Sequence, residues 1–174
     1  EVAAAGLSFC IAKATEASDF EDRQFKANWG GAASIGLARG AYDFGRPDLV
    51  QPEDEAAYFL RTVGPLQTGD MLALDLEDYN GSLSRAIMPV ADWTVRWVRH
   101  VRTQTGFPPL IYTNAGVIQQ YNLARYPELG ECGLWLASWG VPTPPRAPAP
   151  WVAVAFHQYQ VAPAGTVPGI GNAI

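Results

Sequence analysis

Residues 71–78 (MLALDLED) place two carboxylates two positions apart in an otherwise apolar stretch. Because side chains alternate across a strand, Asp75 and Glu77 share one face and the neighbouring leucines share the other. A carboxylate taken out of water without a partner is destabilised until it holds a proton, and a carboxyl that keeps its proton near neutral pH can act as a general acid. The pair therefore predicts a catalytic site on this strand.

The composition limits the classes of protein that this chain can be. Its 174 residues, 48% hydrophobic and 17% charged, fit one globular domain with a substantial core. Twelve Lys and Arg against 17 Asp and Glu give a net charge of −5, and no basic run is present, which argues against nucleic acid as a partner. No segment approaches ~20 uninterrupted apolar residues, so no membrane partner is expected.

The cysteines and histidines do not predict a metal site. Cys10 and Cys132 show no CxxC spacing, and His100 and His157 are too few and too far apart for a zinc centre. We expect no metal and no cofactor. The sequence leaves open whether the two cysteines form a disulfide, and it favours His157 as a packed surface residue rather than a base.

Apolar runs alternate with segments of helical periodicity along the chain, which is typical of an α/β protein with a mostly parallel sheet. A complete eight-unit barrel usually needs ~200 residues or more, so the pattern favours an irregular (β/α) barrel of the TIM-barrel type that is incomplete at both ends. The expected strands are 7–14, 38–44, 70–78, 109–113, 133–139 and 152–159, and the expected helices are 1–5, 19–35, 53–63, 84–105 and 115–121.

Several polar and aromatic residues near the ends of these strands are candidates for binding a substrate. Lys13 lies on an apolar strand, where a lysine is seldom buried unless it is paired, so we expect a partner among the acids of the site; the alternative is an exposed amine at the strand end. Tyr42 and Tyr112 offer a ring and a hydroxyl, although packing explains either almost as well. Of the two tryptophans in GLWLASW, we expect Trp135 in the core and Trp139 in a cleft.

Four separated parts of the chain carry a family resemblance: FCIAKATEASDFEDRQFKANWGGAASIGLARGAYDF, DMLALDLEDYN, PPLIYTNAG, and GLWLASWG followed by AFHQY and GTVPGIGN. In order and spacing they resemble glycoside hydrolase family 25, the muramidase lysozymes, over nearly the whole chain. The resemblance implies a monomeric, extracellular or wall-associated enzyme whose partner is the peptidoglycan glycan strand. It would hydrolyse the β-1,4 bond between N-acetylmuramic acid and N-acetylglucosamine, with residues 1–174 as a single, truncated catalytic domain.

The family's D-x-E motif falls on Asp75 and Glu77. The resemblance implies that Glu77 is the general acid and base, and that Asp75 stabilises charge or orients the acetamide of the substrate. A second anion close to Glu77 is expected to raise its pKa. Gln158 matches a polar position of the family. The family's usual first and last strands, each with an aspartate, have no counterpart here, so activity of residues 1–174 by themselves is left open.

Two other functions remain compatible with the sequence. A catalytically inactive domain that binds cell-wall carbohydrate would keep the aromatic platforms without turnover. A chitinase-like barrel of family 18 would also carry a D-x-E strand, but the aspartate and glycine pattern expected upstream of Asp75 is missing.

Overall fold

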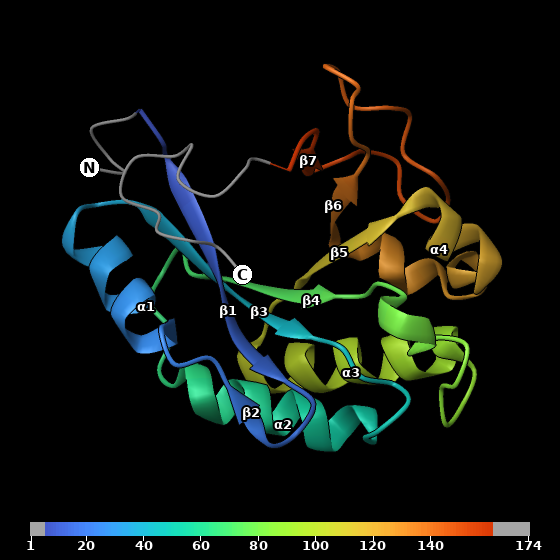
Figure 1. Ribbon diagram of the computed structural model, residues 1–174, viewed down its shortest axis with the longest axis horizontal. Coiled ribbons are helices and arrows are strands. Elements are labelled where there is room, and N and C mark those ends of the chain that lie inside the picture. The colour runs from blue at the N-terminus through green and yellow to red at the C-terminus, as the bar shows by residue number, and fades with distance from the viewer. Residues whose placement is uncertain (1–5, 162–174) are drawn as a thin grey trace.

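The structure, a computed structural model, describes residues 6–161 and resembles an unclosed barrel with helices outside it (Figure 1). The strands are β1 (Phe9–Glu16), β2 (Phe20–Glu21), β3 (Ala38–Phe44), β4 (Met71–Asp75), β5 (Leu110–Asn114), β6 (Gly133–Ala137) and β7 (Phe156–Gln158). The α-helices are α1 (Phe25–Ser34), α2 (Pro52–Val63), α3 (Val90–Thr105) and α4 (Ala115–Gln120). Short 3-10 helices are η2 (Tyr79–Gly81), η3 (Leu123–Arg125) and η4 (Pro127–Glu131).

The strands form one sheet in the order β2-β1-β3-β4-β5-β6-β7, in which only β2 is antiparallel to its neighbour. The sheet curls so that β1 approaches β7, as shown by the rings of Phe9 and Phe156, which lie 5.0 Å apart between centroids. Over residues 6–161 it stays open between β7 and the side of β1 and β2. The predicted α/β fold with an irregular, unclosed barrel is confirmed.

The outer face of the sheet packs against α2 and α3, which lie side by side below it in Figure 1. Leu72, Leu74 and Leu76 point to these helices and are at most 1% exposed, as the alternation in residues 71–78 predicts. Phe59 of α2 and Trp97 of α3 contact each other at 5.7 Å between ring centroids and are fully buried. The hydrophobic core therefore lies between the outer face of the sheet and the helices, and the inner face of the sheet is free to form a binding site.

Two predicted helices begin later than expected. The helix predicted for 19–35 begins at Phe25, because residues 20–21 pair with β1 and the Asp22 carboxylate accepts the Gln24 backbone N–H at 2.8 Å, forming a turn. The helix predicted for 84–105 begins at Val90, immediately after Pro89, because the residue before a proline is disfavoured in the helical region. Both predictions followed apolar spacing and overlooked these local stops.

Most strand predictions agree with the structure to within two residues, but two are too long. The strand predicted for 70–78 ends at Asp75, and the one predicted for 152–159 is reduced to Phe156–Gln158. The expected helix at 1–5 and the loop GTVPGIGNAI lie outside the described residues.

Candidate active site

The two acids of the D-x-E motif lie at the carboxyl end of β4 and face the inside of the curled sheet. Asp75 is the last residue of β4, and its backbone carbonyl accepts the Gly45 N–H at 2.9 Å. The next backbone N–H, of Leu76, donates to the carbonyl of Tyr112 at 2.9 Å. Hydrogen bonds to both neighbouring strands thus continue to the end of β4, and Glu77 follows on the same side as Asp75.

Asp75 and Glu77 line a cleft of about 540 Å³ on this inner face. The predicted residues Lys13 and Tyr42 line it as well. The other lining residues, which the sequence analysis did not single out, are Glu16, Phe20, Asp22, Gln24, Asn28, Phe44 and Tyr79. The structure therefore brings four of the seven predicted site residues into one cleft.

Asp75 is a buried acid with an unpaired oxygen. It is 9% exposed, and within the described part of the chain its Oδ1 accepts no hydrogen bond. Burial raises the pKa of Asp75 well above its ordinary value, the charge of Glu77 raises it further, and the Lys13 ammonium opposes both. An oxygen held out of water without a donor is ready to accept one from a bound molecule.

Glu77 is half-buried, and burial raises the pKa of its carboxyl above the ordinary value. The expected cause was the charge of Asp75, but desolvation accounts for the rise, and the repulsion within the pair raises the pKa of Asp75 instead. The segment after Glu77 is fixed by its own hydrogen bonds, including Leu83 N–H to the Asp78 carboxylate at 3.0 Å. The acid therefore sits on an ordered segment.

Lys13 pairs with Glu16 rather than with Asp75 or Glu77. Its Nζ lies 2.8 Å from Glu16 Oε2, and the other Glu16 oxygen accepts from Arg46 Nη1 at 2.8 Å. Although burial alone would raise the pKa of Glu16, these two cations hold it below its ordinary value. Lys13 is thus a cation anchored in the cleft, with a carboxylate partner that the sequence analysis did not identify.

The remaining predicted residues, Tyr112, Trp139 and Gln158, form a second cluster beside the cleft. The Tyr112 hydroxyl donates to Gln158 Oε1 at 2.8 Å, and Trp139 Nε1 donates to the same oxygen at 2.8 Å. Tyr112 is paired in register with Asp75, so the cluster adjoins the acids. Trp135, expected in the core, is only partly buried and packs edge-on against Tyr112 at 4.9 Å between centroids.

Two acids that the sequence analysis did not identify are buried together on the helix side of the sheet. Asp43 on β3 accepts hydrogen bonds from the Thr15 hydroxyl at 2.6 Å and from Trp97 Nε1 at 3.0 Å. Glu55 on α2 accepts the Arg46 backbone N–H at 2.9 Å, and its other oxygen has no partner among the described residues. Burial raises the pKa of Asp43 to about 7 and that of Glu55 well above its ordinary value.

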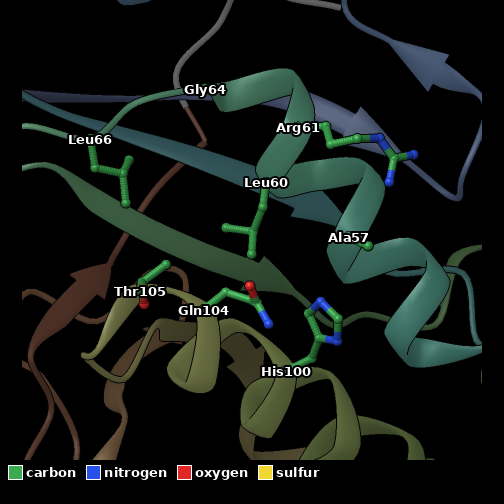
Figure 2. Close-up of a pocket in the computed structure, with 8 residues that line it drawn as sticks. All are labelled: Ala57, Leu60, Arg61, Gly64, Leu66, His100, Gln104 and Thr105. Carbon is green, nitrogen blue, oxygen red and sulfur yellow. The ribbon is translucent and has the colours of Figure 1, made fainter.

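A second hollow, of about 520 Å³, lies between α2 and α3. Figure 2 shows Gln104 and His100 of α3 facing Leu60 and Ala57 of α2. No acid is found among the described residues that line it, so it offers no counterpart to the pair on β4.

The other sequence expectations concern metals, membranes and thiols. In the described ranges, no three or more His, Cys, Asp or Glu side chains are grouped so that they could hold a metal ion. No helix within residues 6–161 has the length and hydrophobicity to cross a bilayer. Cys10 and Cys132 are both free thiols, which answers the question of a disulfide. His157 is partly buried with its Nε2 3.0 Å from the Ser138 carbonyl, as expected for a packed residue.

Known proteins match this chain over nearly its full length. The lysozyme M1 of Streptomyces globisporus is 28% identical over 98% of the chain, and the uncharacterised protein YegX of Escherichia coli O157:H7 is 32% identical over 97%. The chain spans only 59% and 57% of those two proteins. Among solved structures, a bacterial lysozyme from Streptomyces coelicolor superposes with a TM-score of 0.86 at 28% identity, covering 98% of this chain and 80% of that one.

The family comparison decides between the two kinds of hydrolase that the sequence left open. The family model described as glycosyl hydrolases family 25 matches residues 1–170, which include β4 and its two acids as well as the cluster around Gln158. The family 18 alternative is thereby set aside. The chain belongs to glycosyl hydrolase family 25.

Proposed function

We propose that residues 1–174 form the catalytic domain of a peptidoglycan muramidase, which hydrolyses the β-1,4 bond between N-acetylmuramic acid and N-acetylglucosamine. The observation that carries the proposal is the pair of acids at the end of β4, both in one cleft and both with raised pKa values. Family membership and similarity to proteins named lysozymes support it. The partner is the glycan strand of a bacterial wall, and the site of action is extracellular or within the wall.

Glu77 is the general acid and base in this proposal. Its raised pKa keeps a fraction of the carboxyl protonated at pH values where a free glutamate is ionised, so it can donate a proton to the glycosidic oxygen as that bond breaks. Once the leaving sugar has departed, the Glu77 carboxylate can take a proton from the incoming water. General acid–base groups typically contribute ~10²–10⁴-fold to a rate.

Asp75 orients the substrate and stabilises charge. Its Oδ1, which has no partner among residues 6–161, accepts the N–H of the acetamido group on the sugar that is cleaved, which turns the acetamide carbonyl oxygen toward the anomeric carbon. That oxygen forms a bond to the anomeric carbon as the glycosidic bond breaks, and water later opens the cyclic intermediate. In this scheme the net configuration is retained and no protein nucleophile is needed.

The test is a turbidity assay on bacterial peptidoglycan combined with measurement of new reducing ends. We expect Glu77→Gln to lower the rate at least 100-fold with the fold intact. Glu131→Gln, which removes an exposed carboxylate from η4, is the matched control and keeps full activity. Equal lysis by the Glu77→Gln and parent proteins would exclude Glu77 as the acid.

The alternative of a catalytically inactive wall-binding domain gives a different result in the same assay. Such a protein sediments with peptidoglycan but releases no reducing ends, and Glu77→Gln changes neither outcome. Turnover by the parent protein therefore separates the two functions.

A further inference from the structure

The cation of the cleft, Lys13, is held by a partner whose two oxygens are both engaged. Glu16 Oε2 accepts from Lys13 Nζ at 2.8 Å, and Glu16 Oε1 accepts from Arg46 Nη1 at 2.8 Å. The Lys13 ammonium also lies 5.2 Å from the ring centroid of Phe20 and 5.0 Å from that of Phe44. Because the Lys13 and Glu16 side chains are only 26% and 25% exposed, solvent screens their pair in part, and the position of Glu16 decides where the ammonium stands.

Glu16 reaches the cleft because of a bulge in β1, and a buried hydrogen bond on the other face of the sheet fixes that bulge. Between Lys13 and Thr15 the register with β3 shifts, so that β1 uses two residues where β3 uses one. The Thr15 hydroxyl donates to Asp43 Oδ1 at 2.6 Å, and both residues are fully buried. Asp43 thereby holds the strand in the register that turns Glu16 toward Lys13.

A second buried acid fixes the other ligand of Glu16. Glu55 of α2 is fully buried, and its Oε1 accepts the backbone N–H of Arg46 at 2.9 Å. The Arg46 guanidinium donates from Nε and Nη2 to the Asp48 carboxylate at 2.9 and 3.1 Å, which fixes its plane and directs Nη1 to Glu16. Because a buried N–H without an acceptor is costly, loss of Glu55 Oε1 should displace Arg46 and free one oxygen of Glu16.

We propose that Asp43 and Glu55 are positioning residues for the Lys13 ammonium, although they lie on the opposite face of the sheet from the cleft. Asp43 acts through Thr15 and the bulge of β1, and Glu55 acts through Arg46. Both routes end at Glu16, which holds Lys13 in place. The inference rests on the proposed function, since it gives these two acids a part in tuning the site that carries out the reaction.

The group that senses the position of Lys13 is Asp75. The titratable groups that interact with Asp75 are Lys13 and Glu16 on β1, Asp43 and Tyr42 on β3, Glu77 after β4, and Tyr112 on β5. Lys13 is the cation of this set, and its charge lowers the pKa of Asp75, whereas burial and the neighbouring carboxylates raise it. If the ammonium loses its anchor and moves toward solvent, the pKa of Asp75 should rise. Asp75 therefore reports whether Lys13 is in place.

The experiment titrates Asp75 by NMR of its side-chain carboxyl carbon in the full chain and its variants. Lys13→Met should raise the pKa of Asp75, and its shift sets the full size of the effect. Glu55→Leu removes the acceptor of the Arg46 N–H, and Thr15→Val removes the donor to Asp43. Each should raise the pKa of Asp75 by at least half of the Lys13→Met shift.

Two further proteins separate positioning from a general loosening of the fold. Glu55→Gln keeps the acceptor oxygen for Arg46, so the pKa of Asp75 should stay at the parent value. In a Lys13→Met background, Glu55→Leu should not move the pKa of Asp75 any further, because the cation through which it acts is gone. Asp54→Asn, on the exposed face of the same helix, is the control and should change nothing in either background.

Glu55→Leu and Thr15→Val act by separate routes, so whichever of them folds is sufficient for the test. An unchanged pKa of Asp75 in a folded variant would overturn the proposal. The same conclusion follows if Glu55→Leu raises that pKa equally with and without Lys13.

The titration needs no substrate, so a failure of this inference is distinguishable from a failure of the proposed function. Release of reducing ends from wall by the parent, with the pKa of Asp75 unmoved in the variants, overturns the positioning alone. The expected shifts without any release of reducing ends overturn the muramidase activity alone. If both hold, the acid limb of the profile of kcat/KM against pH should move to higher pH in Glu55→Leu, as in Lys13→Met.

Discussion

The buried acids Asp43 and Glu55 make the free energy of unfolding depend on pH. The substitution Glu55→Gln should remove most of that dependence, because the folded variant no longer binds the extra proton. In the folded protein, burial keeps a proton on this pair, with the pKa of Asp43 raised to about 7. The charged groups around the pair are Lys13 on β1, Arg46 in the segment after β3, and Asp75 on β4. Thr15 and Trp97 contribute only neutral hydrogen bonds.

The sign follows from proton counting. In the unfolded chain, carboxyl groups have pKa values of about 4, so they lose their protons at a lower pH than the folded pair does. Between about pH 4 and pH 7 the folded state binds more protons, and the free energy of unfolding falls as pH rises. One proton corresponds to about 1.4 kcal/mol per pH unit, so the pair costs about 2 to 3 kcal/mol between pH 5 and pH 7.

Glu55→Gln replaces the protonated carboxyl with an amide of nearly the same shape. The amide oxygen still accepts the Arg46 backbone N–H, and the amide nitrogen can donate toward Asp43 without titrating. We expect the variant and parent to be equally stable within about 1 kcal/mol at pH 5, and the variant to be more stable by about 2 kcal/mol at pH 8.

The assay is urea unfolding followed by tryptophan fluorescence at pH 5, 6, 7 and 8. Asp54→Asn, which removes an exposed carboxylate from the same helix, serves as the control and should leave the slope against pH unchanged. Asp75 and Glu77 also have raised pKa values, but they are common to both proteins and cancel in the comparison. If Glu55→Gln lowers stability by the same amount at every pH, the pair holds no extra proton and the reasoning fails.

Three further outcomes are expected. Lys13→Met removes the cation that lowers the pKa of Asp75, so the acid limb of the profile of kcat/KM against pH should move to higher pH. An unchanged acid limb would argue against a role for ionised Asp75 in the reaction. Asp75→Asn should lower kcat about 100-fold or more while wall binding, measured by sedimentation, persists. Arg39→Met should lower the free energy of unfolding by about 3 kcal/mol, because it leaves the Asp70 carboxylate, whose side chain is only 5% exposed, without its bidentate partner and removes the guanidinium stacked 4.0 Å over Trp29. A loss below about 1 kcal/mol in denaturant titration would show that the ion pair contributes little to stability.

The face of the strand on which each acid lies could be predicted because it depends only on local geometry. Alternation with period two placed Asp75 on the strand face opposite to that of Leu74 and Leu76. In the structure the leucines pack against α2 and α3, and Asp75 lies in the cleft. The same rule places Asp43 on the helix side, since Tyr42 lines the cleft. What it could not show is that Glu55 of α2 lies near Asp43, because that depends on how the helix is seated.

The partner of Lys13 could not be predicted, for a reason that is visible in the backbone. The register of β1 shifts between Lys13 and Thr15, so the alternation breaks and Glu16 comes to the same side as Lys13. Strict alternation would have put Glu16 on the opposite face. An irregularity of one residue thus decided which acid neutralises the cation of the cleft.

The sequence by itself determined the α/β alternation, the shared face of Asp75 and Glu77, and the family. All three depend on residues close together in the chain or on motifs in a fixed order. Only the tertiary structure decided that Gln158 accepts hydrogen bonds from both Tyr112 and Trp139, the first of them 46 residues away. Contacts of that kind depend on strand order and on the curl of the sheet, which packing of the whole core determines and no local pattern encodes.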